Sequence, residues 1–364
     1  TRSGYTPQDS LNDKKKHLMV VDPNGTWLHD WRSNFDALEI PFLRSPMDIH
    51  PSPRDPRDLY AFAVNQKRTN EFHIMHHTHG KVSHGFTGPH QLPSTALFND
   101  FCSMLVRAFS LDDILRTGYV QSIQECTNPT ISRRYQAILS DGQIIYADNI
   151  VMALGPNMNS DSCLIEPSGA FPQEKLVPSG NLATWLTSFK QSLEKEECTC
   201  VPDSVLIVGG GITSGHAARV AHDIGIKPII VLRSGLKVQQ FDVDLRWMGK
   251  QRSSLIGSFR EQESAQNRIC TCFRERKGSF SPEVHDSLCE LQQQGEVELY
   301  TDCNVVSLYW QNDVNRWKVR LDNGTICEPS YIWSATGTDV QVEQYPVLGD
   351  LRKSHPIESF CGFP

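Results

Sequence analysis

The stretch Val205–Ala218, VLIVGGGITSGHAA, decides the fold of this chain. An apolar run leads directly into three glycines, and small residues suited to a helix follow. Gly209 permits a tight turn from strand to helix, and Gly211 lets the backbone approach a pyrophosphate. Ser214, with Gly215 after it, keeps the helix close to the strand. The start of such a helix offers free N–H groups and a partial positive charge to phosphates. The predicted cofactor contacts in this loop are Gly209, Gly210, Gly211, Thr213 and Ser214.

The sequence after this motif completes a βαβ unit and indicates which nucleotide it binds. A second apolar run, Pro228–Leu232, predicts the next parallel strand, and Arg233 and Ser234 follow it, with no Asp or Glu from Lys227 to Gln240. NAD sites place an acid at the end of this strand, whereas NADP sites place a cation. We therefore predict NADPH, with Arg233 and Ser234 on the 2′-phosphate. The alternatives are a glycine-rich turn without a ligand and an ordinary surface arginine.

One supersecondary layout occurs on both sides of this unit. Predicted hairpin strands around Asp141-Gly142 and around Asn323-Gly324 each lead to an apolar strand that ends in glycine, Ala147–Pro156 and Tyr331–Gly337. Two copies predict an α/β fold with two Rossmann-like domains, the second inserted in the first. Small residues at the two strand ends either let the chain pass close to a cofactor or pack tightly. The candidate cofactor contacts there are Gly155, Thr336 and Gly337.

Further elements follow from local patterns. His17–Asp22 predicts a strand that stops at Pro-Asn-Gly. Apolar periodicity predicts helices at Trp27–Ile40, Leu59–Asn65, Pro93–Phe109 with Ser94 as cap, Leu182–Leu193, and Ser281–Gln294 with Ser281 as cap.

Composition excludes several classes of protein. The chain has 364 residues, 39% hydrophobic residues and a net charge of -7, which argues against a nucleic-acid binder. No apolar run approaches the ~20 residues of a membrane span. Eleven cysteines without any Cys-x-x-Cys pair favour reduced thiols and a cytoplasmic location over a disulfide framework.

The histidine-rich segment offers a competing hypothesis. His76, His77 and His79 could ligate a transition metal, with His73 and His84 close in sequence. No helical period or nearby carboxylate organises them, so we predict a solvated loop and no metal site. A hydrolase is disfavoured because no Gly-x-Ser-x-Gly elbow occurs.

Taken together, these motifs resemble the flavin-dependent monooxygenase superfamily, especially the N-hydroxylating ornithine/lysine type. The resemblance extends from His17 onward, and its glycine fingerprint is specific for nucleotide binding only. The segments that carry it are Val20–Trp27, Ile40–Pro46, Val151–Pro156, Val205–Ala218, Gln240–Asp244 and Trp333–Thr338.

The resemblance implies FAD and NADPH as cofactors and a monooxygenase that hydroxylates a nucleophilic N or S centre of a small molecule. It places Asp22 at the FAD ribose, although Asp22 before Pro-Asn-Gly also suits a turn. It assigns no catalytic acid or base. The implied division is 1–16 polar tail, 17–160 FAD-type domain without its first βα unit, 161–200 connector, 201–330 NAD(P)H-binding domain and 331–364 shortened return to the FAD-type domain.

Two other functions stay open. The chain has no second Gly-x-Gly ahead of Asp22, and we expect both ends to be truncated relative to the family. This favours a non-catalytic NADPH-binding sensor or interaction protein as the alternative. Another flavin-dependent pyridine-nucleotide oxidoreductase, such as a disulfide reductase, is disfavoured by the missing Cys-x-x-Cys. The oligomeric state is not encoded in any of these patterns.

Overall fold

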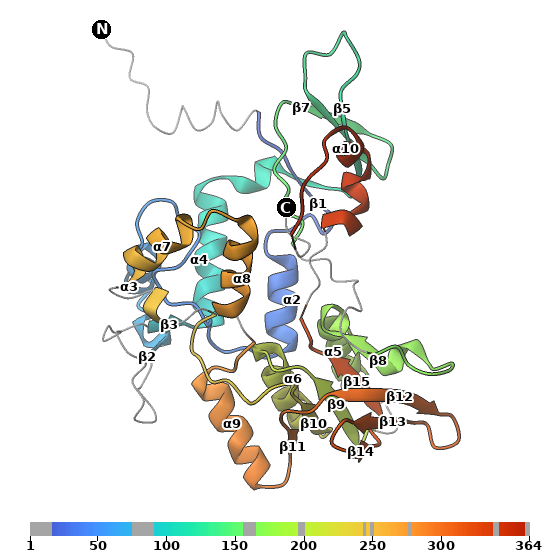
Figure 1. Cartoon of the computed structure of the whole chain (residues 1–364). Helices are drawn as coiled ribbons and strands as arrows, with labels where there is room; N and C mark the ends of the chain where they lie inside the picture. The colour runs from blue at the N-terminus through green and yellow to red at the C-terminus, as the bar shows by residue number, and fades with distance from the viewer. Residues whose placement is uncertain are drawn as a thin grey trace.

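A parallel five-stranded sheet forms the lower half of the molecule (Figure 1). The computed structural model describes residues 17–74, 91–155, 165–195, 201–242, 245–247, 251–275, 278–337 and 342–360. The strand order is β11-β10-β9-β15-β8, and every pairing is parallel. The elements of this sheet and its helices are β8 (Leu176–Pro178), α5 (Ser179–Glu194), β9 (Ser204–Val208), α6 (Ile212–Asp223), β10 (Lys227–Val231), α9 (Pro282–Gln293), β11 (Glu298–Tyr300) and β15 (Tyr331–Ser334).

The two faces of this sheet are covered by different layers. Val205 and Ile207 of β9 pack with α5 and α6, whereas Leu206 between them packs against an antiparallel sheet on the other face. A strand buried on both faces needs an unbroken apolar run, which explains why β9 is apolar throughout. The covering sheet consists of β12 (Val305–Gln311), β13 (Arg316–Leu321) and β14 (Ile326–Cys327).

A helical region forms the first part of the chain. The α4 helix begins after Ser94, whose hydroxyl accepts a hydrogen bond from the Leu97 N–H at 3.0 Å, as the capping pattern predicts. Its stripe of Leu97, Phe101 and Leu105 is buried against Leu59 of α3. The elements of this region are β1 (Val20–Asp22), α2 (His29–Ala37), α3 (Asp58–Asn65), β2 (Phe72–Ile74), β3 (Gln91–Pro93), α4 (Thr95–Ala108) and β4 (Leu115–Thr117).

A third group of elements brings the end of the described chain back to the first part. The antiparallel sheet β5 (Val120–Glu125), β6 (Tyr135–Leu139) and β7 (Ile144–Ala147) packs against the C-terminal helix α10 (Gly349–Ser354). Their shared core contains Ile123, Val342, Val347 and Leu348. In Figure 1 this group stands at the upper right, apart from the five-stranded sheet.

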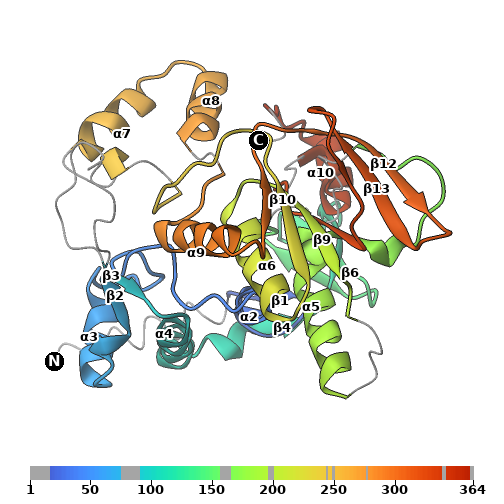
Figure 2. The same cartoon turned by 90° about the horizontal axis from the view of Figure 1, so that it is seen from below.

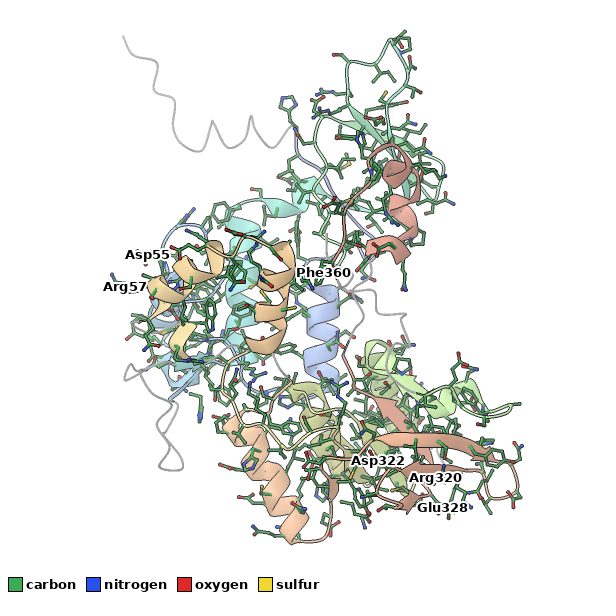
Figure 3. All side chains as sticks on the ribbon, viewed as in Figure 1. Asp55, Arg57, Arg320, Asp322, Glu328 and Phe360 are labelled. Atoms are coloured by element: carbon green, nitrogen blue, oxygen red, sulfur yellow. The ribbon has the colours of Figure 1, made fainter. Side chains whose placement is uncertain are left out.

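Two groups of charged residues lie on opposite sides of the molecule. Figure 3 shows Asp55 and Arg57 at the outer edge of the helical region, and Arg320, Asp322 and Glu328 on the outer β12–β14 sheet at the opposite side. The remaining helices, α7 (Arg252–Arg260) and α8 (Ala265–Glu275), project to one side when the molecule is seen from below (Figure 2).

The structure corrects one predicted strand. The segment expected as the buried strand Ala147–Pro156 is strand only up to Ala147, and Val151 is 90% exposed. Its apolar run therefore misled the prediction, because no described neighbouring strand pairs with residues 148–155. The second copy, β15, is a buried strand as predicted, with Ile332 and Trp333 inaccessible to solvent.

The five-stranded sheet takes its strands from three of the segments expected from the sequence. β8 lies in the predicted connector 161–200, and β15 lies in the predicted return segment 331–364, yet β15 pairs with both β9 and β8. Strands from both sides of residues 201–330 thus join the strands of the βαβ unit in one sheet.

Candidate functional site

A cavity of about 1520 Å³ lies at the carboxyl ends of β9, β10 and β15. The chain order reverses between β9 and β15, which makes this edge the switch point where open α/β sheets bind their ligands. The volume exceeds the ~300–1,000 Å³ typical of pockets for drug-sized ligands. Both halves of the chain line it, so it is positioned between the first part and the βαβ unit. The predicted residues that line it are Gly209, Gly210, Gly211, Thr213, Arg233, Ser234, Thr336 and Gly337.

Gly209 is required where the glycine loop meets the end of β15. A Cβ added at this residue would lie 2.2 Å from the carbonyl oxygen of Ala335, and its φ of +145° is one that other residues rarely adopt. The Ala335 N–H donates to the Val208 carbonyl at 2.8 Å, and the Gly209 N–H donates to the Val231 carbonyl at 3.0 Å. The first glycine thus allows two strand ends to converge beneath the cavity.

Gly211 has a different role, because a Cβ there would meet no atom within 4 Å. The residue begins α6 with ordinary backbone geometry, and no side chain caps the helix. The space beside its backbone therefore suits a ligand group. The first residues of α6, Ile212 and Thr213, line the cavity, and the free N–H groups at the start of a helix bind phosphates favourably. Ser214 does not line the cavity; its hydroxyl donates to the Gly211 carbonyl at 2.6 Å and helps to fix the loop.

The role predicted for Gly215 changes in the structure. A Cβ at Gly215 would lie 2.3 Å from Cγ1 of Val284 in α9 and 3.0 Å from the ring of Phe280. This glycine therefore allows close packing of α9 against α6, rather than of α6 against its strand. Periodicity within α6 could not reveal a partner that lies about 70 residues later.

Arg233 and Ser234 stand at the cavity after β10, as the sequence predicts. Both are exposed, and Arg233 makes no hydrogen bond or ion pair with any residue that the structure describes. A guanidinium with unused donors suits bidentate contact with a phosphate group. The residues beside it on the cavity wall include Lys237, a second cation.

The first part of the chain supplies a wall that sequence reasoning missed. Asn34 and Phe35 of α2, and Leu38 directly after it, line the cavity. The end of α2 is held by Arg219 of α6, whose Nη2 donates to the carbonyls of Leu38 and Glu39. A cation at the C-terminal carbonyls of a helix is favourable, but only the tertiary structure shows that these two helices meet.

His216 is a buried polar group in this wall. The side chain is 7% exposed, and its Nδ1 has no hydrogen-bond partner among the described residues. Burial, and secondly the positive charge of Arg219, lower the pKa of His216 to about 4. His216 is therefore neutral near pH 7 and adds no charge to the cavity.

The two remaining predicted contacts lie away from this cavity. Asp22 ends β1, and its Oδ1 accepts hydrogen bonds from the N–H groups of Asn24 at 2.8 Å and Gly25 at 3.1 Å. These bonds form the turn that was the alternative interpretation, so contact with a ribose stays a prediction. The Gly155 carbonyl accepts a hydrogen bond from the Tyr345 hydroxyl at 2.7 Å, and Gly155 does not line the cavity.

The described residues do not support a metal site or a membrane span. No group of three or more His, Cys, Asp or Glu residues within them is arranged to hold a metal ion. His73 belongs to β2 and not to a loop, whereas His76, His77, His79 and His84 lie outside the described residues. None of the described helices combines the length and apolar composition needed to cross a membrane.

Comparison with solved structures gives a consistent result over the whole described fold. L-lysine 6-monooxygenase from Pseudomonas syringae has a TM-score of 0.62 over 96% of this chain and 83% of its own, at 14% identity. An FAD-bound cadaverine monooxygenase from Erwinia amylovora has a TM-score of 0.61 over 96% of this chain and 80% of its own, at 15% identity. Ornithine N-hydroxylase from Kutzneria, with reduced FAD, NADP+ and L-ornithine, has a TM-score of 0.58 over 95% and 85%, at 14% identity.

These similarities show a shared fold. The chain is an α/β protein with parallel, Rossmann-like sheets of the kind found in these solved structures. No protein-family model and no curated protein sequence matches the chain.

Proposed function

We propose that this protein is an FAD- and NADPH-dependent monooxygenase that hydroxylates a nucleophilic nitrogen of a small amine. The carrying observation is the cavity at the β9–β15 switch point, where the glycine loop and Arg233 face a common space. The similar solved structures support the reaction class, because they are a lysine 6-monooxygenase, a cadaverine monooxygenase and an ornithine N-hydroxylase.

The described residues fit NADPH. Open space beside the Gly211 backbone accommodates a pyrophosphate, and the start of α6 offers N–H donors to it. Arg233 and Ser234 lie at the position that distinguishes a 2′-phosphate from a 2′-hydroxyl. Thr336 and Gly337, which follow the neighbouring strand β15, line the same cavity. These residues bind and orient the nucleotide.

The described residues offer less to FAD. β1 and β4 form a parallel pair, and Oδ1 of Asp22 already serves the turn, which leaves only Oδ2 for a ribose. The sequence contains no second Gly-x-Gly, so no glycine loop for the FAD pyrophosphate can be assigned. When bound, FAD supplies the redox chemistry and oxygen activation, and the protein supplies orientation and exclusion of water.

A second candidate function rests on Asp22, whose Oδ1 is already used in a turn. A chain that binds NADPH and retains no flavin would be a sensor or interaction protein that does not turn NADPH over. The NADPH-binding residues are shared by both candidates, so flavin retention separates them.

The test combines flavin binding with product formation. The purified chain is mixed with FAD, freed of excess, and incubated with NADPH, oxygen and either lysine, ornithine or cadaverine. We expect a retained flavin spectrum and an N-hydroxylated amine that forms only when NADPH is present. A chain that binds NADPH but retains no flavin and forms no product would contradict the enzyme and support the sensor.

A further inference from the structure

The segment that follows β10 forms an arch that backbone hydrogen bonds hold at both ends. The Leu232 N–H donates to the Tyr300 carbonyl at 2.8 Å, which fixes the start. The Phe280 N–H donates to the Lys237 carbonyl and the Gln239 N–H donates to the Phe280 carbonyl, both at 2.9 Å, which fixes the far end. Between them, the arch carries Arg233 and Ser234. We call residues 233–242 the phosphate loop.

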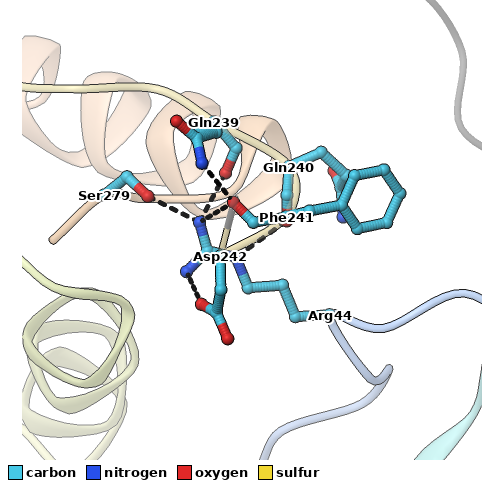
Figure 4. Close-up of polar contacts among 6 residues, drawn as sticks. All are labelled: Arg44, Gln239, Gln240, Phe241, Asp242 and Ser279. Atoms are coloured by element: carbon cyan, nitrogen blue, oxygen red, sulfur yellow. Dashed lines mark hydrogen bonds and ion pairs between the residues drawn. The ribbon is translucent and has the colours of Figure 1, made fainter. Parts of the chain in front are cut away.

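Arg44 reaches this loop from the first part of the chain, about 195 residues earlier in sequence (Figure 4). Its Nε donates to the Gln240 carbonyl at 2.7 Å, and Nη1 donates to Oδ1 of Asp242 at 2.8 Å. Its Nη2 contacts the carbonyls of Gln239 at 2.7 Å and Phe241 at 3.1 Å, and Oγ of Ser279 at 2.6 Å.

These contacts place one guanidinium at the centre of the loop's far end. The Arg44 side chain is 16% exposed, so its bonds are largely shielded from water. Burial lowers the pKa of Arg44, while the Asp242 carboxylate opposes that change. The three backbone carbonyls are acceptors that need a donor when buried, and only a planar fork serves so many at once.

The backbone that carries Arg44 is itself fixed. The Leu43 N–H donates to the Pro93 carbonyl at 3.0 Å, and the Met47 N–H donates to the Gln91 carbonyl at 2.9 Å. Both acceptors belong to β3, next to the buried helix α4. Arg44 therefore transmits the position of a rigid scaffold to the phosphate loop.

We infer that Arg44 is a positioning residue that holds the phosphate loop in the shape that selects NADPH over NADH. The inference rests on the proposed NADPH site. Without Arg44, the segment from Gln239 to Asp242 would lose its bonds to the guanidinium, and Arg233 would have to be reordered each time a 2′-phosphate binds. The first part of the chain would thereby control the nucleotide selectivity of the βαβ unit.

The test measures the dissociation constants of NADPH and NADH by calorimetry for the full chain, Arg44→Met and Arg44→Lys. Arg44→Met should weaken NADPH by about 5- to 30-fold, the effect of reordering the backbone of one residue at each binding event. Binding of NADH should weaken much less, so the selectivity ratio, which is the dissociation constant of NADH divided by that of NADPH, falls. Arg44→Lys should rescue the ratio only in part, because an ammonium lacks the fork.

Arg68→Met is the matched control. Arg68 also lies in the first part and is 25% exposed, and it makes ion pairs with Glu71 at 2.5 Å and Asp100 at 2.6 Å. Its loss should lower the melting temperature without changing the selectivity ratio. Should Arg44→Met not fold, Ser279→Ala removes one acceptor, and Asp242→Asn replaces the charged acceptor with a weaker neutral one. Each should lower the ratio.

The outcomes separate this inference from the proposed function. The role of Arg44 alone is overturned if the wild-type chain binds NADPH selectively and the folded Arg44 variants keep the same selectivity ratio. If the Arg44 variants do not fold, an unchanged ratio in Ser279→Ala and Asp242→Asn overturns it. A wild-type chain that binds neither nucleotide overturns the NADPH site and this inference with it.

Discussion

Replacing Arg233 with alanine should weaken NADPH far more than NADH. The side chain is exposed and has no partner among the described residues, so its removal leaves no unsatisfied group and should not change folding. The loss is confined to the contact with the 2′-phosphate. Hydrogen bonds to charged groups contribute ~1.5–3 kcal/mol, which corresponds to a roughly 10- to 150-fold larger dissociation constant for NADPH.

The assay is calorimetric titration with each nucleotide at two salt concentrations. NADH, which lacks the phosphate, should change by no more than about twofold, within the usual effect of a surface substitution. Added salt should weaken NADPH binding less in the variant than in the wild type, because the variant lacks one charge contact with the phosphate. Arg260→Ala is the control, since Arg260 is exposed at the end of α7 and does not line the cavity. Equal losses for both nucleotides would refute the 2′-phosphate role.

Three further predictions test the structural argument around the glycine loop. Gly211→Ala should keep the melting temperature, since a Cβ there meets no atom within 4 Å, but should weaken NADPH by occupying its space; unchanged calorimetric affinity would contradict this. Gly215→Ala should destabilise the fold by ~1–3 kcal/mol through overpacking, and Val284→Ala should restore part of that loss in a urea double-mutant cycle; simple additivity would argue against the contact. The His216 pKa lies below its ordinary value of 6.5, at about 4, owing to burial and Arg219, so the unfolded chain binds the proton more readily. The free energy of unfolding therefore loses nothing to His216 above pH 6.5, and it falls by at most ~3 kcal/mol as the pH drops from 6.5 to about 4. His216→Leu should flatten that part of the urea-measured pH profile, and an unchanged slope would exclude His216 as its source.

The sequence predicted the βαβ unit closely because every local signal there agrees. The strand, turn and helix of Val205–Ala218 appear as β9, the glycine loop and α6, and the caps Ser94 and Ser281 begin their helices as expected. Such signals depend on neighbours within a few residues. Consistency between the apolar pattern and the glycine positions left little freedom in the local fold.

Features that depend on distant segments could not be predicted in the same way. The apolar run Val151–Leu154 reads as a strand but has no pairing partner among the described residues, and pairing is a tertiary property. Gly215 was assigned to helix–strand packing because Val284 of α9 is remote in sequence. The contacts of Arg44 could not be read from its neighbours in sequence, since its acceptors are about 195 residues away.

The central claim is that this chain passes electrons from NADPH to a bound flavin, and anaerobic mixing tests it most directly. The chain is equilibrated with FAD, freed of excess, and mixed with NADPH or NADH while the visible flavin absorbance is followed. We predict rapid bleaching with NADPH and slower bleaching with NADH at equal concentration. A flavin-loaded chain that NADPH does not bleach, or a chain that retains no flavin, would contradict the account.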